Sequence, residues 1–176
     1  MLTNLRQAAI ASAVFLVLLG LAYPLAETGI GQALFSHQAN GSLTANGSTQ
    51  VGQSWKSPRW FVGRPDSDNP LATGGTNLGP RSKTLVQDTA KQIAQLRKEG
   101  INPTPDLVTT SGSGVDPDIS PADAYAQVNS VAKARGLPAA EVRALVAAHI
   151  QGAQFGFLGS QYINVLQLNE ALARMK

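Results

Sequence analysis

The segment LVTTSGSGVDPDISP, Leu107–Pro121, gathers the residue types that could do chemistry. Glycines and hydroxyl residues in this density are typical of loops whose backbone N–H groups bind a phosphate. Aspartates at short spacing are ligands that a hard cation prefers. Ser and Asp also cap the N-termini of helices. Three interpretations therefore compete: a nucleotide site, a cation site and an ordered helix cap.

The nucleotide interpretation depends on the residues after the glycines. A phosphate loop of the ATPase kind needs a lysine after its last glycine and then a Ser or Thr that binds magnesium. Here Gly114 is followed by Val115 and Asp116, and the aspartate would repel a phosphate. The motif therefore does not match a phosphate loop. If the segment binds a cofactor at all, the candidate residues are Ser111, Ser113 and Asp116.

The cation interpretation depends on Asp116, Asp118 and Asp123, whose spacing loosely resembles that of a calcium loop. The central glycine and terminal glutamate of such a loop are missing, and a proline stiffens the middle. We therefore expect an ordered cap first. In that arrangement a strand at Leu107–Thr110 leads through a glycine turn to a helix whose positive N-terminal end is served by Asp118, Ser120 and Asp123.

Other catalytic chemistry finds little support. The chain has no cysteine, which excludes disulfides, thiolate catalysis and cysteine-ligated metals. Its two histidines, His37 and His149, lack the spacing of a zinc site. The TSGSG sequence is not the G-x-S-x-G turn of a serine hydrolase. Because the net charge is only +3 and the basic residues are dispersed, nucleic acid is a poor partner. We expect no catalytic residue and no metal site.

An uncharged apolar run from Gln7 to Ala26 precedes these residues. At about 1.5 Å per helical residue, it can cross a hydrocarbon core of about 30 Å. Arg6 lies before it and no Lys or Arg occurs after it until Lys56, so the positive-inside rule places the N-terminus in the cytoplasm and the rest outside. A cleaved signal peptide is the alternative, but Pro24 makes a poor cleavage site.

The remaining chain predicts one external domain. We expect an anchor over residues 1–27 and an extracytoplasmic domain over 28–176, in which 36–50, with its two ANGS sequences, is a flexible insertion. The segment WKSPRWFVGR interleaves aromatic and basic residues, which favours either a short strand or a contact with a partner protein. Trp60 and Arg64 are its candidate partner contacts.

Periodicity and capping residues predict an α+β fold: one N-terminal transmembrane helix, then a mixed domain with about four helices and a small sheet of short strands. The predicted helices of the domain are Ser82–Glu99, Ser120–Arg135, Pro138–Gln151 and Asn164–Met175. The predicted strands are Gln50–Gln53, Arg59–Val62, Leu107–Thr110 and Tyr162–Val165.

Several motifs together resemble one protein family. They are GRP at Gly63–Pro65, NLGP at Asn77–Pro80, the block at Leu107–Pro121, FGFLG at Phe155–Gly159 and INVLQLN at Ile163–Asn169. They resemble the C subunit of the bacterial Kdp potassium-transporting P-type ATPase, the KdpC family, over nearly the whole chain. Asp118 departs from the family, in which we expect histidine, and Gln161 and Tyr162 replace a Pro-Arg-like pair.

The resemblance implies a non-catalytic subunit that spans the bacterial cell membrane once. It implies partners: a channel-like subunit that carries potassium, a P-type subunit that hydrolyses ATP, and a further small membrane peptide, all in the lipid bilayer. The partners would handle ATP and potassium, so this chain would bind no cofactor tightly. The family's C subunit is described as an assembly factor and as a catalytic chaperone that raises affinity for ATP.

The predicted topology bears on that chaperone role, because ATP is cytoplasmic and the polar part of this chain is expected outside. We therefore favour indirect action through the complex. Small residues in the anchor, including the candidate partner contacts Ala9 and Ala13, would allow close approach of a partner helix. An anchored periplasmic cation- or ligand-binding module is the alternative function.

Overall fold

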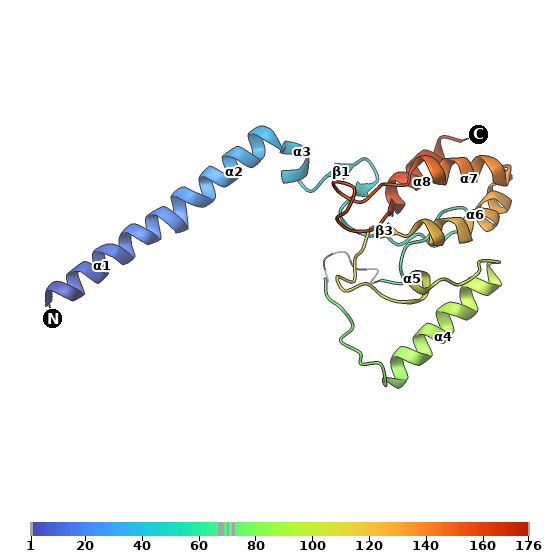
Figure 1. Cartoon of the computed structure of the whole chain (residues 1–176), viewed down its shortest axis with the longest axis horizontal. Coiled ribbons are helices and arrows are strands. Elements are labelled where there is room, and N and C mark those ends of the chain that lie inside the picture. Colours follow the sequence, from blue (N-terminus) through green and yellow to red (C-terminus); the bar gives the residue numbers. More distant parts are fainter. Residues whose placement is uncertain (1, 67–68, 70, 72, 176) are drawn as a thin grey trace. The chain divides into compact units, whose positions relative to one another are not determined.

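The structure is a computed structural model that describes residues 2–66, 69, 71 and 73–175 of the 176-residue chain. The chain divides into two compact units, one up to Leu43 and one from Thr44 onward. The first unit is mainly a long helix, and the second is a small domain of helices with short strands (Figure 1).

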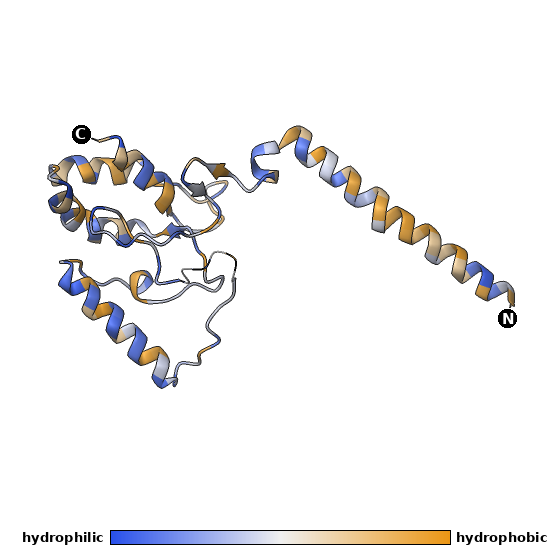
Figure 2. Ribbon diagram, turned by 180° about the vertical axis from the view of Figure 1, so that it is seen from behind, coloured by the Kyte–Doolittle hydropathy of each residue, from blue (hydrophilic) through white to orange (hydrophobic). Residues whose placement is uncertain are grey.

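The long helix runs from Leu2 to Leu34 and is the one helix in the described residues that is long and apolar enough to cross a membrane. It consists of α1 (Leu2–Val17), the π-helical turn η1 (Leu18–Ala22) and α2 (Tyr23–Leu34). Figure 2 shows apolar residues along most of its length. Pro24 explains the π-helical turn, because proline cannot donate to the carbonyl of Gly20 and its ring crowds that carbonyl.

The predicted insertion at residues 36–50 contains regular structure. Ser36–Ala39 forms the short helix α3, and β1 (Leu43–Thr44) pairs with β2 (Gly47–Ser48). In the second unit, Thr44 Oγ1 and Asn46 Nδ2 each donate to Glu170 at 2.9 Å. The hydrogen bonds of Glu170 fix one end of this segment to the domain, and the flexibility of the rest stays a prediction.

The four helices predicted for the domain are confirmed. They are α4 (Lys83–Lys98), α6 (Pro121–Arg135), α7 (Ala139–Ala148) and α8 (Val165–Ala173). Helix α7 ends before its predicted limit because Gln151 exchanges two backbone hydrogen bonds with Tyr162, of 2.8 and 3.1 Å, and this pairing requires extended backbone. The α+β class is confirmed, and the described residues contain two separate two-stranded sheets instead of one.

The strand predictions need correction. The strand predicted at Leu107–Thr110 is wrong, because Pro105 starts a helical turn, α5 (Pro105–Val108). Gln50–Gln53 and Arg59–Val62 form no strand either. Only the prediction at Tyr162–Val165 is confirmed in part, since β4 (Ile163–Asn164) pairs antiparallel with β3 (Asp118–Ile119).

Two buried amide side chains explain why Arg59–Val62 has no strand neighbour. The Asn169 side chain accepts from Phe61 N and donates to Phe61 O, both at 2.9 Å. Gln127 does the same for Val62, at 2.8 and 3.0 Å. Side chains from α8 and α6 therefore take the place of the neighbouring strands.

The core lies between α6, α7, α8 and the β3–β4 pair. Its main cluster of buried apolar residues comprises Phe61, Ile119, Ala124, Val128, Val131, Ala132, Val142, Val146, Ile163, Val165, Leu168 and Leu172. A smaller cluster joins α4 to α5 through Leu96, Ile101 and Leu107. Most of α4 remains at the surface, and Figure 2 shows polar and apolar residues alternating along it.

Candidate functional site

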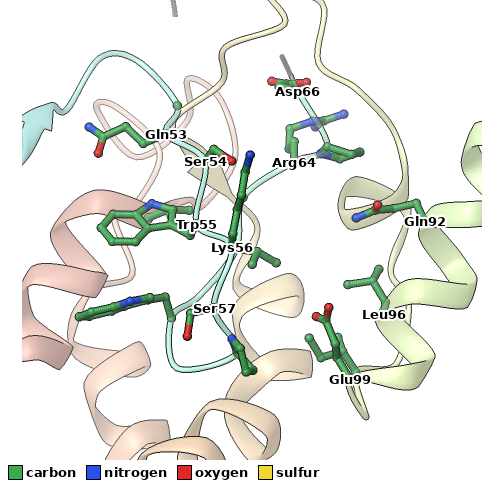
Figure 3. Close-up of a pocket in the computed structure, with 18 of the residues that line it drawn as sticks. Gln53, Ser54, Trp55, Lys56, Ser57, Arg64, Asp66, Gln92, Leu96 and Glu99 are labelled. Carbon is green, nitrogen blue, oxygen red and sulfur yellow. The ribbon is translucent and has the colours of Figure 1, made fainter. Parts of the chain in front are cut away.

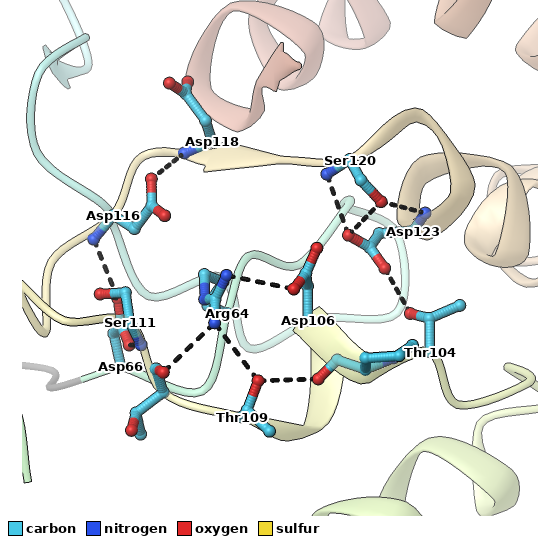
Figure 4. A network of polar contacts seen from close by, with 12 residues as sticks. Arg64, Asp66, Thr104, Asp106, Thr109, Ser111, Asp116, Asp118, Ser120 and Asp123 are labelled. Atoms are coloured by element: carbon cyan, nitrogen blue, oxygen red, sulfur yellow. Dashed lines mark hydrogen bonds and ion pairs between the residues drawn. The ribbon is translucent and has the colours of Figure 1, made fainter. Parts of the chain in front are cut away.

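The segment Ser111–Asp116, here called the SGSG loop, is held by one carboxylate that lies far away in the sequence. Asp66 accepts hydrogen bonds from Ser111 N at 2.7 Å, Ser111 Oγ at 2.5 Å and Asp116 N at 2.9 Å (Figure 4). Two backbone N–H groups and a hydroxyl therefore converge on an anion, as in a phosphate site. The anion, however, belongs to the chain itself.

Arg64, two residues before Asp66, holds the segment that leads into the loop. Its guanidinium donates to Asp106 Oδ1, Thr109 Oγ1 and Thr110 O, each at 3.2 Å. Burial and the charge of Asp123 raise the pKa of the Asp106 carboxyl, and Arg64 acts against this rise. We call the two residues the Arg64–Asp66 clamp. The clamp gives the GRPD sequence a structural role, because Arg64 binds the segment Asp106–Thr110 before the SGSG loop and Asp66 binds both ends of the loop itself.

Close packing of backbone against backbone explains two glycines at the loop. Gly114 has a φ of +70°, and a Cβ atom there would lie 2.5 Å from Gly74 O. A Cβ atom on Gly52 would lie 2.5 Å from Asp116 O. Gly52 N also donates to Val115 O at 2.7 Å. Larger residues at either position would push the neighbouring chain away from the SGSG loop.

The loop leads into a helix cap, as predicted. Ser120 Oγ accepts from Asp123 N at 3.2 Å, and the Asp123 carboxylate accepts from Ser120 N at 2.9 Å, which completes a capping box. Asp123 is only 1% exposed and also accepts from the hydroxyls of Ser120 and Thr104. Its charge is thus satisfied by three donor groups and by the N-terminus of α6.

Asp118 does not take part in this cap, which corrects the prediction. It lies in β3 and accepts from Asn164 Nδ2 at 2.9 Å, while its backbone N–H donates to Asp116 Oδ1 at 3.1 Å. Burial raises the pKa of the Asp118 carboxyl, the hydrogen bond from Asn164 lowers it, and the charge of Asp116 raises it further.

The candidate ligands are therefore brought close together but are already paired within the chain. Ser111 donates to Asp66 through its backbone N–H and its hydroxyl, and Ser113 Oγ lies 3.2 Å from Ser111 Oγ. Across the described part of the chain, no three His, Asp or Glu side chains gather in a way that could hold a metal ion. The hydrogen bonds that hold the SGSG loop thus come from within the chain.

A pocket of about 320 Å³ lies beside the clamp, between residues 51–66 and α4. Figure 3 shows Lys56 on one side and Gln92, Leu96 and Glu99 on the other. Its walls mix amide, charged and apolar side chains. The pocket is a cleft between two segments of the domain.

The candidate partner contacts lie in different surroundings. The Trp60 ring is 5.4 Å from the Trp55 ring, between centroids, and 5.0 Å from the Arg135 guanidinium, so it packs within the domain. Arg64 belongs to the clamp. Ala9 and Ala13 are exposed on α1, where the structure leaves them accessible to another helix.

Sequence reasoning missed Asp66, Gln127 and Asn169, which organise the site and its support. Asp66 directly follows the GRP motif, and this position was the one feature of the sequence that could have indicated its importance. The two amides sit at buried positions of helical patterns, where a polar residue needs a partner. Their partners are 65 and 108 residues away, beyond the reach of local pattern.

Comparison with known proteins shows to which family the chain is related. The family model described as "K+-transporting ATPase, c chain" matches residues 5–174. The potassium-transporting ATPase KdpC subunit of Caulobacter vibrioides is 47% identical and covers 98% of this chain and 93% of its own length. That of Sorangium cellulosum is 48% identical and covers 98% of both chains. That of Rhodopseudomonas palustris is 43% identical over 98% of this chain and 97% of its own. The chain belongs to the family of the c chain of K+-transporting ATPases, the KdpC family.

Proposed function

We propose that the chain is a non-catalytic accessory subunit of an ATP-driven potassium uptake complex, needed for assembly and stability of that complex. It is anchored by the helix Leu2–Leu34 and acts from the extracytoplasmic side. Its relatives in Caulobacter vibrioides and Sorangium cellulosum are named as subunits of a potassium-transporting ATPase. On this proposal the ATP-hydrolysing P-type subunit and the potassium-carrying channel-like subunit are its partners, together with a further small membrane peptide.

One observation supports a non-catalytic role more than any other. The SGSG loop is the part of the chain whose composition best suits a phosphate, and its converging donors are used by Asp66. A nucleotide phosphate would have to displace this carboxylate and then lie beside Asp116, against charge repulsion. The loop is therefore better suited to fixing the domain's shape than to binding ATP.

The orientation rests on the distribution of positive charge. Arg6 lies before the apolar run, and the next basic residue is Lys56, far beyond its end. The positive-inside rule then favours the domain outside the cell, away from ATP. The chain therefore promotes ATP binding by the P-type subunit indirectly, by stabilising the assembled complex through contacts in the bilayer and outside it.

The test compares the complex reconstituted with and without the full-length chain. We expect that omitting the chain raises the apparent KM for ATP in ATP hydrolysis or causes the complex to dissociate. Calorimetry of the purified chain in detergent should give no heat of ATP binding, with the assembled complex as the positive control. ATP binding by the chain alone, at concentrations that saturate the complex, would contradict an indirect role.

A further inference from the structure

The connection between α7 and α8 carries large apolar side chains that face solvent. Phe155 is 86% exposed, Phe157 is 75% exposed and Leu158 is 50% exposed. All three lie in the turn Gln154–Gly159, here called the FGFLG tip, in the stretch between the orange helix and the red helix of Figure 1. The main core is formed by other residues, so the tip does not contribute to it.

The tip is held in one conformation by its own backbone. Gln154 and Leu158 exchange two hydrogen bonds, both of 2.9 Å, and Gly156 N donates to Ala153 O at 3.0 Å. The Gln151–Tyr162 pair closes the base of the connection. Because the turn is already ordered, little conformational entropy would be lost when its side chains are buried against a partner.

Phe155 has an unfavourable backbone conformation, with φ at +53°. Glycine or asparagine adopts this left-handed region readily, whereas a bulky aromatic residue is an outlier there. The exposed ring of Phe155 gives the isolated domain little packing in return. Strained backbone conformations cluster at binding and active sites.

The chemistry around the tip fits a protein better than a lipid surface. From Ala144 to Asn169 the sequence contains no Asp, Glu, Lys or Arg. In the sequence the tip is followed by two exposed uncharged polar residues, Ser160 and Gln161. Protein interfaces have this anatomy, with aromatic residues at a charge-poor centre and a polar rim. Anionic lipid surfaces attract Lys and Arg, and bilayer interfaces favour Trp and Tyr.

We propose that the FGFLG tip inserts into an uncharged apolar groove on the extracytoplasmic face of another subunit of the potassium-transport complex. This rests on the proposed function above. The two phenylalanines and the leucine would bury roughly 400 Å² on this chain, about half of one side of a standard interface. Two copies that met through their tips would form too small an interface to persist. A subunit already held beside its partners by a membrane helix needs less area, because tethering raises the effective concentration.

Variants of the full-length chain test the proposal against a matched control. Phe155→Gly removes the ring and relieves the backbone, and Phe157→Ser removes the second ring. Val86→Ser, at another exposed apolar position that is 62% exposed on α4, is the control. Binding to the detergent-purified complex that lacks this chain should weaken roughly tenfold to thirtyfold for the tip variants, and remain unchanged for Val86→Ser. The Tm of Phe155→Gly should equal or exceed that of the unmodified chain.

A photo-crosslinking amino acid at position 157 identifies what the tip contacts. Crosslinks to a larger subunit of the complex support the proposal, whereas crosslinks mainly to lipid or to a second copy overturn it. Unchanged affinity of both tip variants also overturns it and leaves the proposed function intact. If the unmodified chain does not bind the other subunits at all, the proposed function fails and the docking proposal fails with it.

Discussion

Replacing Asp66 by asparagine should destabilise the domain strongly although the two side chains have nearly the same shape. Asp66 accepts three hydrogen bonds, from Ser111 N, Ser111 Oγ and Asp116 N. An asparagine oxygen could keep some of them, but its NH₂ group would face a donor. Hydrogen bonds to a charged group contribute about 1.5–3 kcal/mol each. We therefore expect the free energy of unfolding to fall by about 2–4 kcal/mol, since the losses are not additive.

Tryptophan fluorescence during heating of the full-length chain in detergent measures this change. Both tryptophans, Trp55 and Trp60, lie in the unit that begins at Thr44, so the signal reports on that unit. The expected loss corresponds to a fall in Tm of roughly 10 °C. Asp88→Asn is the control, because Asp88 pairs only with Lys91 on the exposed surface of α4 among the contacts that the structure describes. Its effect should stay below about 0.5 kcal/mol.

A second measurement on the same position separates an internal anion from a ligand site. Asp66→Ala leaves three donors without their acceptor, so inorganic phosphate should raise the Tm of this variant and leave that of the unmodified chain unchanged. A loss of stability in Asp66→Asn no greater than that in Asp88→Asn would refute the structural role of the Asp66 carboxylate. Stabilisation of the unmodified chain by phosphate or ATP, as large as that of the alanine variant, would refute it equally.

Three further substitutions test individual contacts. Ser120→Ala removes the cap of α6 and should lower the free energy of unfolding by about 1–2 kcal/mol, measured by thermal unfolding. Ser82→Ala should lower it by only about 0.5 kcal/mol, because the hydrogen bond from Leu85 N to Ser82 is 3.4 Å long. Equal losses in the two variants would contradict this. The raised pKa of Asp118 means that the folded state keeps this proton to higher pH than the unfolded state, so the contribution of Asp118 to the free energy of unfolding should fall as pH rises above the pKa of an unfolded aspartate, about 3.9. Asp118→Asn should flatten this slope while Asn164 keeps an acceptor, and an unaltered slope in Tm against pH would exclude Asp118 as its cause. Ala13→Leu should reduce co-purification with the other subunits more than Ala11→Leu, which lies about 200° away around the helix; equal recovery would remove this face of α1 as a contact.

Helices were predictable here because their signals are local. Ser120 and Pro121 start α6, and Gly136 ends it with a φ of +71°, all within the helix's own sequence. The strand predicted at Arg59–Val62 failed for the opposite reason. Its backbone is bound by Gln127 and Asn169, which lie in helices distant in the sequence.

The candidate site was predictable in composition but not in role. The sequence indicates that Ser111, Ser113 and Asp116 could bind an anion, and the structure shows an anion bound there, the Asp66 carboxylate. Nothing in the local pattern pairs Asp66 with residues 45 and 50 positions away. A loop closed by the chain itself and a loop that awaits a ligand have the same composition, and only the tertiary contact distinguishes them.

The side of the membrane on which the domain lies tests the proposed function most directly. Because the chain contains no cysteine, Lys133→Cys on the exposed side of α6 gives a single labelling site. We predict that a membrane-impermeant maleimide labels this cysteine in intact cells. Labelling only after the cytoplasmic side is opened, as in inside-out vesicles, would contradict an extracytoplasmic domain and would allow direct contact between this chain and ATP.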